Sequence, residues 1–226
     1  MATSGSTDFS LDARSIINKA FLVAKVVAPG ETATATEMED AELDLNLMLK
    51  SWSAKEHLWI RTEGSQALTA STASYVISGA RRIESVRRRT SSIDTPMNEL
   101  SRQEYYDLPT KSGTGTPVSW YFDPQRATRT LYVWPTASTA VAANTVLHFT
   151  YMRVIEDIDA LENDPDVPQE WLEALIYNLA VKIAGQYSDR SQADIMALRL
   201  EAKALLDDLT SQDQETASIY FQPGRQ

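Results

Sequence analysis

The chain has 226 residues, 43% of them hydrophobic, and a formal net charge of −10. This length and composition are those of a globular protein with a sizeable core. The negative charge argues against tight, sequence-independent binding of nucleic acid, because that affinity comes from cations placed on the phosphates. The chain has no cysteine, which excludes disulfides, a thiolate nucleophile and cysteine-ligated metal sites and fits a reducing compartment.

The start of the chain shows no targeting signal. Its first ten residues lack the basic start and the apolar run of a signal peptide. No apolar stretch approaches the ~20 residues that span a bilayer. We therefore expect a soluble protein that is not exported by a signal of its own.

Two amphipathic helices are predicted before residue 57. The first covers residues 11–27, where apolar residues recur every three or four positions, and it should end at Pro29–Gly30. The second should begin at Thr36, because Thr36 and Glu39 have the spacing of a capping box. Acidic residues crowd its first turns, where the positive end of the helix dipole favours them. The stripe expected to be buried is Met38, Ala41, Leu45, Met48 and Trp52.

Between residues 58 and 153 the period of the hydrophobic pattern changes. Short runs rich in β-branched and aromatic residues, bounded by Gly, Pro, Ser and Asp, predict an antiparallel β insertion. One short helix is expected inside it, because Ser101 and Glu104 have capping-box spacing.

The five arginines of residues 81–89, with one glutamate among them, are the most basic stretch of the chain. In an alternating strand, Arg82, Glu84 and Val86 would share a face with Arg88, and Ile83 would lie on the other face. A simple interpretation is a solvated strand whose charge discourages stray strand pairing. We favour contact with an acidic partner, either another copy of this protein or DNA phosphates. The candidate subunit-interface or DNA-channel residues are Arg81, Arg82, Arg87, Arg88 and Arg89.

The densest aromatic stretch, residues 119–138, predicts a β-hairpin with a connection of about six residues. Alternation places Trp120 and Phe122 on one face and Tyr121 on the other, and puts Tyr132 and Trp134 together on one face of the second strand. A stacking platform for single-stranded nucleic acid would need a basic groove beside these rings. The nearby arginines lie in the turn, so we favour a packing role and keep a ligand platform as the alternative.

Two further helices are predicted near the C-terminus. The third should open with Asp166 as its cap and Pro168 in its first turn, and run to Gly185. The fourth should run from Ser191 to about Leu209. Its apolar positions alternate in steps of three and four, which is typical of helices packed lengthwise at small angles. These positions are Ile195, Leu198, Ala202, Leu205 and Leu209.

The tail after Leu209 is polar except for Ile219, Tyr220 and Phe221. Three apolar residues without periodicity cannot build a core, so this segment should dock onto another surface. That surface is either its own domain or a partner.

No pattern in the chain predicts catalysis. His57 and His148 lie in no catalytic or ligand motif and are expected to be helix-terminal or solvent-facing. The carboxylates of residues 156–173 lie on a polar loop, where a general acid would not gain a raised pKa, and Val167 stands where a calcium loop needs glycine. The glycines of residues 112–117 lack the strand and helix of a phosphate-binding loop. We expect no catalytic residue, metal or cofactor.

Together these elements predict an α+β protein. Helix pairs in residues 1–57 and 154–209 should form a helical bundle, with the antiparallel β insertion 58–153 between them. Residues 210–226 should form an extended C-terminal tail.

The order of these segments resembles the head-to-tail adaptor proteins of short-tailed bacteriophages, the tail accessory or packaged-DNA stabilisation family. The matching stretches are residues 28–59, 80–86, 99–135 and 147–187. The Pro-x-x-x-Tyr-Phe-Asp-Pro run, the Leu-Tyr-x-Trp-Pro run and the helix after Asp166 are the most similar parts. No single motif is decisive, and the resemblance rests on order and spacing.

The resemblance implies a structural virion protein and not an enzyme. Members of the family form a ring, usually of twelve copies, beneath the portal, extend the DNA channel and offer a platform to a downstream tail or nozzle protein. They fasten to the portal partly through the C-terminal helix and tail, which assigns portal binding here to Ile219, Tyr220, Phe221 and Arg225. The expected location is the neck of a virion assembled in the host cytoplasm, without a membrane, with double-stranded DNA passing during packaging and ejection.

Two alternatives to the connector stay open. One is a tail-associated peptidoglycan hydrolase that uses paired carboxylates. The other is a nucleic-acid-binding module that uses the arginine strand. Charge favours the connector, because a negative channel lets DNA slide whereas strong phosphate contacts would slow it.

Overall fold

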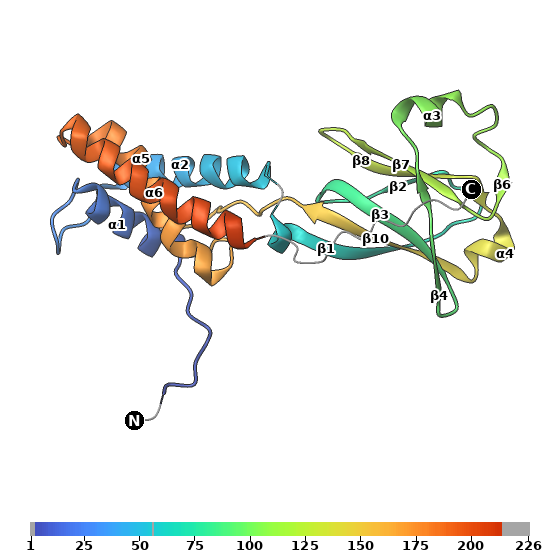
Figure 1. Ribbon diagram of the computed structural model, residues 1–226, viewed down its shortest axis with the longest axis horizontal. Coiled ribbons are helices and arrows are strands. Elements are labelled where there is room, and N and C mark those ends of the chain that lie inside the picture. The colour runs from blue at the N-terminus through green and yellow to red at the C-terminus, as the bar shows by residue number, and fades with distance from the viewer. Residues whose placement is uncertain (1–2, 56, 214–226) are drawn as a thin grey trace. The chain divides into compact units, whose positions relative to one another are not determined.

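The computed structural model describes residues 3–55 and 57–213, and divides the chain into two compact units (Figure 1). The helical unit combines the chain up to Trp59 with the chain from Ile155 onward, and the β unit is Ile60–Val154. About 40% of the residues are helical and 25% lie in strands, which confirms the mixed α+β class. None of the described helices is long and apolar enough to cross a membrane.

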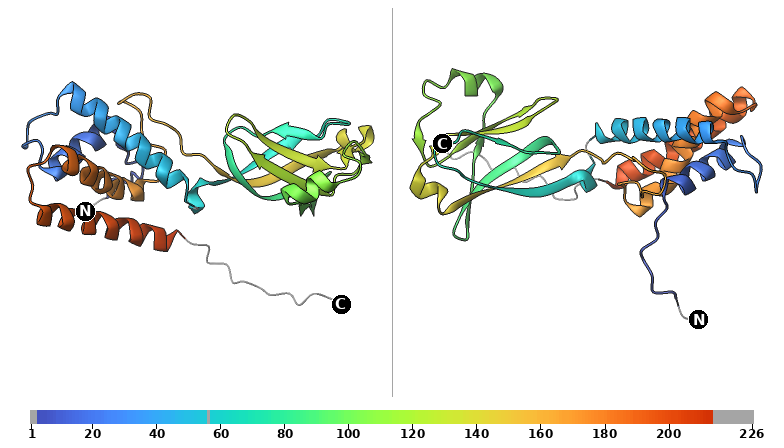
Figure 2. Two further views of the ribbon diagram at one scale, coloured as in Figure 1. Left: turned by 90° about the horizontal axis from the view of Figure 1, so that it is seen from above. Right: turned by 180° about the vertical axis from the view of Figure 1, so that it is seen from behind.

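The long helices of the helical unit pack in layers. They are α1 (Ala13–Ala24), α2 (Ala35–Ser53), α5 (Leu172–Tyr187) and α6 (Gln192–Gln212). The helix α5 packs against each of the other three, most extensively against α1 and α6. Seen from above, α2 and α6 lie on opposite sides of the layer that α1 and α5 form (Figure 2).

The first two helices begin and end differently from the prediction. In α1 the Asp12 carboxylate accepts a hydrogen bond from the Ser15 amide at 2.8 Å, and the helix ends at Lys25, which has a φ of 57°. The capping box of α2 is formed by Thr34 and Glu37, two residues before the predicted pair. Both pairs have the required spacing, and the earlier one adds half a turn without moving the buried stripe. That stripe is confirmed, because Met38, Ala41, Leu45, Met48 and Trp52 are all buried.

The C-terminal helices also depart from the predicted boundaries. Asp166 does not cap a helix but accepts a hydrogen bond from the Glu156 amide at 3.1 Å, and a 3-10 turn, η2 (Gln169–Trp171), precedes α5. The helix α5 continues through Gly185 and ends at Tyr187, so Gly185 does not terminate it as predicted. The helix α6 begins where predicted, with Ser191 as its N-cap, but it extends past Leu209 into the segment expected to be tail. Of the stripe predicted for α6, only Leu198 and Ala202 are buried.

The β unit contains two four-stranded sheets. In the first sheet the order is β1-β10-β3-β4, all antiparallel: β1 (Arg61–Ala67), β10 (Thr145–Arg153), β3 (Ala80–Thr90) and β4 (Ile93–Pro96). In the second sheet the order is β2-β8-β7-β5: β2 (Ser74–Val76), β8 (Arg129–Trp134), β7 (Ser119–Pro124) and β5 (Asn98–Glu99).

Two short pairings depart from the antiparallel prediction. The strand β5 runs parallel to β7, and β6 (Thr114–Gly115) runs parallel to β9 (Thr136–Ala137). Three short helical segments complete the connections: η1 (Leu58–Ile60), α3 (Arg102–Asp107) and α4 (Thr139–Ala142). The predicted capping box of Ser101 and Glu104 starts α3.

The predicted aromatic hairpin is formed by β7 and β8. Trp120 pairs with Val133 and Tyr121 with Tyr132, so the two faces are as predicted, and the connection is shorter because Pro124 already pairs with Arg129. The side chains of one hairpin face enter a core that the two sheets share. Its buried members include Trp120, Leu131 and Val133 from the hairpin and Val86, Leu147 and Phe149 from the first sheet.

The predicted alternation along β3 holds from Ser85 to Arg89 but breaks at Glu84, because the strand contains a bulge there. Its partner β10 pairs Thr150 with Ser85 but Tyr151 with Ile83, which leaves Glu84 as the extra residue. Ile83 and Val86 therefore both reach the core, although strict alternation would separate them.

Two glycine-to-alanine substitutions are expected to act in opposite directions. A Cβ at Gly64 would lie 2.6 Å from Cε2 and 2.8 Å from Cζ of Phe149, so Gly64→Ala should lower the free energy of unfolding by about 1–3 kcal/mol. Gly185 is exposed within α5, and a Cβ there would meet no neighbouring side chain within 4 Å. Gly185→Ala should therefore raise the free energy of unfolding by about 0.5–1 kcal/mol. Equilibrium urea denaturation measures both, and equal effects would contradict the assigned environments.

Candidate interaction surfaces

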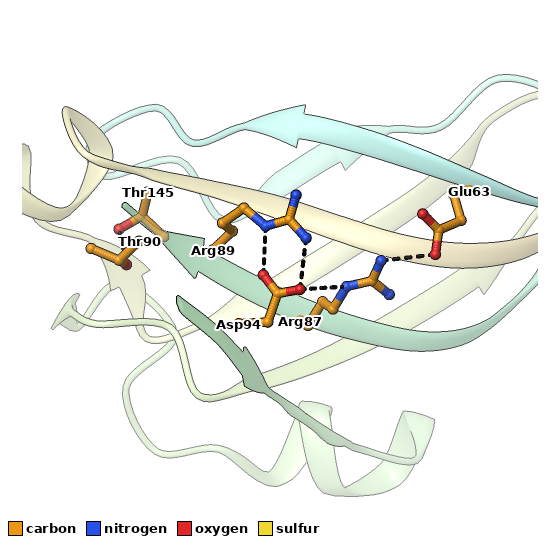
Figure 3. Close-up of polar contacts among 6 residues, drawn as sticks. All are labelled: Glu63, Arg87, Arg89, Thr90, Asp94 and Thr145. Atoms are coloured by element: carbon orange, nitrogen blue, oxygen red, sulfur yellow. Dashed lines mark hydrogen bonds and ion pairs between the residues drawn. The ribbon is translucent and has the colours of Figure 1, made fainter. Parts of the chain in front are cut away.

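The strand β3 contributes to a charged network on the face of the first sheet that points away from the core (Figure 3). Arg89 binds Asp94 through two hydrogen bonds, Nε to Oδ1 at 2.6 Å and Nη2 to Oδ2 at 2.7 Å. Arg87 connects Asp94 to Glu63, with Nε 3.2 Å from Asp94 Oδ2 and Nη2 2.8 Å from Glu63 Oε1. We call these four residues, Glu63, Arg87, Arg89 and Asp94, the outer ion network. It links β1, β3 and β4 across β10.

In the outer ion network, the pKa values of Glu63 and Asp94 are lowered and that of Arg89 is raised. Hydrogen bonds from Arg89 and its charge hold the pKa of Asp94 below the ordinary value. Hydrogen bonding from Arg87 lowers the pKa of Glu63, and the partner Asp94 raises the pKa of Arg89. Each of these three shifts favours the charged form of the group, as expected for paired ions.

The other predicted arginines lie elsewhere. Arg88 projects to the opposite face, beside the buried Leu147, and donates to the Pro117 carbonyl at 2.8 Å. A guanidinium nitrogen of Arg81 lies 3.6 Å from the Met152 sulfur, while Arg82 is exposed. The structure therefore brings Arg87 and Arg89 together but does not gather all five arginines into one patch.

Acidic residues of the same unit offset part of this basic charge. The Oε2 of Glu84, the extra residue of the bulge, lies 2.7 Å from the Nε of Arg61. Glu63 and Asp94 pair with Arg87 and Arg89. Glu63 and Asp94 come from other strands, so the run of arginines in the sequence gave no sign of them.

The outer face of the aromatic hairpin is covered by α3. The ring of Tyr105 lies 5.4 Å from that of Tyr121 and 5.0 Å from that of Tyr132, measured between centroids. Tyr105 and Tyr121 are almost fully buried, and burial raises the pKa of both phenols. Tyr106 remains about half exposed. The hairpin rings thus pack on both faces, in agreement with the packing role.

His57 is buried, so the prediction of a helix-terminal or solvent-facing histidine is wrong for this residue. Its ring is 1% exposed and packs edge-on against Trp171, with centroids 4.7 Å apart, and stacks on Trp59 at 5.9 Å. Trp52 packs against the other side of Trp171 at 5.7 Å. By contrast, His148 is half-buried on the outer side of β10. Sequence reasoning missed this aromatic cluster because Trp171 lies far from Trp52 and His57 in the chain.

Asp213 ties the end of α6 to this cluster. Its Oδ2 lies 3.2 Å from His57 Nδ1, and the Leu58 amide donates to the same carboxylate at 3.0 Å. These contacts hold the end of α6 against its own unit. The predicted portal-binding residues Ile219, Tyr220, Phe221 and Arg225 lie outside the described residues.

The acidic run before α5 binds cationic and amide groups of its own unit. Lys50 pairs with Asp157, and Arg14 donates to Glu162 at 2.6 Å. The contact with Arg14 lowers the pKa of Glu162, the opposite of what a general acid requires. Within residues 3–55 and 57–213, no group of three or more His, Asp or Glu side chains is arranged to hold a metal ion.

Comparison with known proteins gives a family match and matches to solved structures. A family model described as SU10 adaptor protein matches residues 20–226. No curated protein matches the chain. Among solved structures, a chain from the neck of an empty gene transfer agent (GTA) particle, computed with C6 symmetry, is 9% identical over 87% of this chain and 93% of its own, with a TM-score of 0.29. A chain from the neck of a native GTA particle, computed with C12 symmetry, is 11% identical over the same shares, with a TM-score of 0.25.

The outer ion network should make stability depend on acid pH. The lowered pKa of Asp94 means that its ionised form stabilises the fold, an effect present above the ordinary Asp pKa of 3.8 and lost as pH falls through the lowered value. We expect Asp94→Asn to lower the Tm modestly at pH 7, less so in high salt, and to match the parent protein well below pH 3.8. Glu99→Gln, an exposed acid of the same unit outside the network, is the control. A Tm difference that persists in strong acid would contradict the pairing.

Proposed function

The chain belongs to the SU10 adaptor protein family, and from this we propose that it is a structural head-to-tail connector of a phage virion. In this role it forms a ring beneath the portal, extends the DNA channel and provides the platform for later tail components. The observation that carries the proposal is the family match itself, because residues 20–226 include the whole β unit and most of the helical unit.

We infer that the helices of the helical unit form a bundle that serves as the rigid body of each subunit. Support comes from α5, which packs against α1, α2 and α6 and is buried along most of its length. The β insertion, residues 58–153 as predicted, would act as a separate domain, since its sheets share a core of their own.

The portal is the proposed partner of the C-terminal segment. The helix α6 leads to Asp213, which the Leu58 amide and His57 hold in place. A segment that leaves from a fixed point loses less entropy on docking than one that leaves from a mobile end. This supports portal binding by Ile219, Tyr220, Phe221 and Arg225. The remaining partners are further copies in a dodecamer, a downstream tail or nozzle protein, and DNA in transit during packaging and ejection.

The charge of the protein suits a channel that does not hold DNA. The net charge is −10, and Arg87 and Arg89 are already bound to Asp94 and Glu63. Few cations are thus left in this network to replace the counterions of a duplex. We propose that the arginines of β3 serve the subunit or its interface more than DNA, in a particle assembled in the host cytoplasm.

The alternative of a carboxylate-dependent peptidoglycan hydrolase gains no support from these contacts. A glycosidase needs one carboxylic acid with a raised pKa, whereas Glu162 has a lowered pKa and Asp157 is paired with Lys50. We propose a connector without catalysis.

Electron microscopy of the protein mixed with the portal protein of its own phage tests this function. We expect a twelve-fold ring on one face of the portal. Replacing Tyr220 and Phe221 with alanine should weaken attachment by roughly thirtyfold or more, because the loss of even one hot-spot side chain costs at least about 2 kcal/mol. The matched control is Val76→Ala, which removes a 60% exposed apolar side chain from the β unit. A full-length protein that never associates with the portal would refute the proposal.

A further inference from the structure

Two apolar helix faces of the helical unit point outward. On α2, Leu43 and Leu47 are 60% and 55% exposed, although the helix is anchored by the fully buried Leu45. Each lies two residues from Leu45, which is about 160° around the helix axis. Leu43 and Leu47 therefore form one ridge on the side of α2 that faces away from the core.

The helix α6 has the same arrangement. Met196 and Leu200 are 50% and 67% exposed and lie two residues before and after the buried Leu198. Leu198 and Ala202 are the buried residues of this helix, so α6 contacts its own unit along one narrow stripe. A helix with an apolar ridge opposite its buried stripe is typical of a helix that is covered on both sides.

These two ridges cannot cover one another within a single copy. The helices α2 and α6 lie on opposite sides of the layer formed by α1 and α5 (Figure 2). The outward ridge of α2 thus points away from one side of the unit, and that of α6 points away from the other. In a row of copies, the α6 ridge of one copy can meet the α2 ridge of the next, and this contact can repeat.

The charges beside the ridges favour contact between α6 of one copy and α2 of the next over contact between two α6 helices. On α2, the exposed Glu39 lies one turn before Leu43, and Lys50 on the same side is held by Asp157 and the Ile155 carbonyl. On α6, Arg199 and Lys203 are exposed beside Leu200, and Lys203 also lies 3.9 Å from the exposed Asp207 one turn further on, a pairing that solvent screens. An α6 ridge against an α2 ridge brings basic and acidic groups together, whereas two α6 ridges would oppose cations.

We propose that the ridge of Met196 and Leu200 on α6 docks onto the ridge of Leu43 and Leu47 on α2 of the neighbouring copy. The inference rests on the proposed function, in which the protein forms a ring. Because the contact joins two different surfaces, it is heterologous, and such a contact closes into a ring when the rotation between copies is suitable. The two apolar ridges become buried, and Arg199 and Lys203 lie near Glu39.

Crosslinking tests the pairing directly, because the chain contains no cysteine. Leu43→Cys and Leu200→Cys are made singly and together, assembled with the portal protein and treated with a short bismaleimide. We expect no crosslink within either single variant, one dimer band in their mixture, and a ladder of oligomers for the double variant. Dimers formed by one single variant alone would indicate that like helices pair and would overturn the proposal.

Acidic substitutions on the ridges give an independent test. Leu43→Glu with Leu47→Glu blocks the α2 ridge, and Met196→Glu with Leu200→Glu blocks the α6 ridge. Each double variant should reduce the ring fraction at least tenfold, while their equal mixture forms a heterodimer through the one intact pair of ridges. Because all four side chains are exposed, the far-UV spectrum and Tm of the monomer should stay close to those of the parent. Ile93→Glu, at a residue of β4 that is 71% exposed, is the matched control and should keep the ring.

The outcomes separate this inference from the proposed function. A parent protein that forms no ring with or without portal contradicts the function, and the inference falls with it. A ring that persists when either ridge carries glutamate contradicts the inference alone and leaves the connector role in place. Loss of the ring in both ridge variants, with the heterodimer in their mixture, supports both.

Discussion

Burial of α5 is the constraint on which the helical unit depends. Its buried residues include Ala174, Leu175, Leu179 and Ile183, which cover much of its circumference. A helix that is apolar on several sides must be enclosed by neighbours. The helices α1, α2 and α6 provide this enclosure, and the order of the layers follows from it. As a consequence, α2 and α6 become the outer layers, and any further apolar surface on them faces outward.

The same layering connects the fold to assembly. Two outer helices on opposite sides of one unit give each copy two different surfaces, which is what a closed ring of identical subunits requires. At the end of α6, the contacts of Asp213 with His57 and the Leu58 amide hold this helix end against its own unit. One helix thus serves two proposed roles, contact with the next copy along its length and contact with the portal beyond its end.

The parts of the fold that depend on local spacing could be predicted from the sequence. The capping box at Ser101, the N-cap at Ser191 and the pairing of the aromatic hairpin follow from neighbouring residues. The predicted start of α2 is two residues late because Thr34 and Thr36 both satisfy the same local rule.

The parts that depend on distant partners could not be predicted. The bulge at Glu84 exists only in the pairing of β3 with β10, and it changes which residues reach the core. The burial of His57 needs Trp171 from the other end of the chain, and the neutralisation of Arg87 and Arg89 needs Glu63 and Asp94. Apolar periodicity also cannot distinguish a ridge covered by the same chain from one covered by another copy. For this reason it predicts burial of Ile195, Leu205 and Leu209 and gives no sign of the outward ridges that contain Leu43 and Met196.

We propose that this chain works as one copy in a ring whose subunits cover each other's outer helices. The most direct measurement is a cryo-electron microscopy reconstruction of the protein assembled on its portal. We predict that α6 of each copy lies against α2 of the next, with Leu43, Leu47, Met196 and Leu200 buried at every contact. A ring in which these four side chains face solvent, or single copies bound without neighbours, would contradict it.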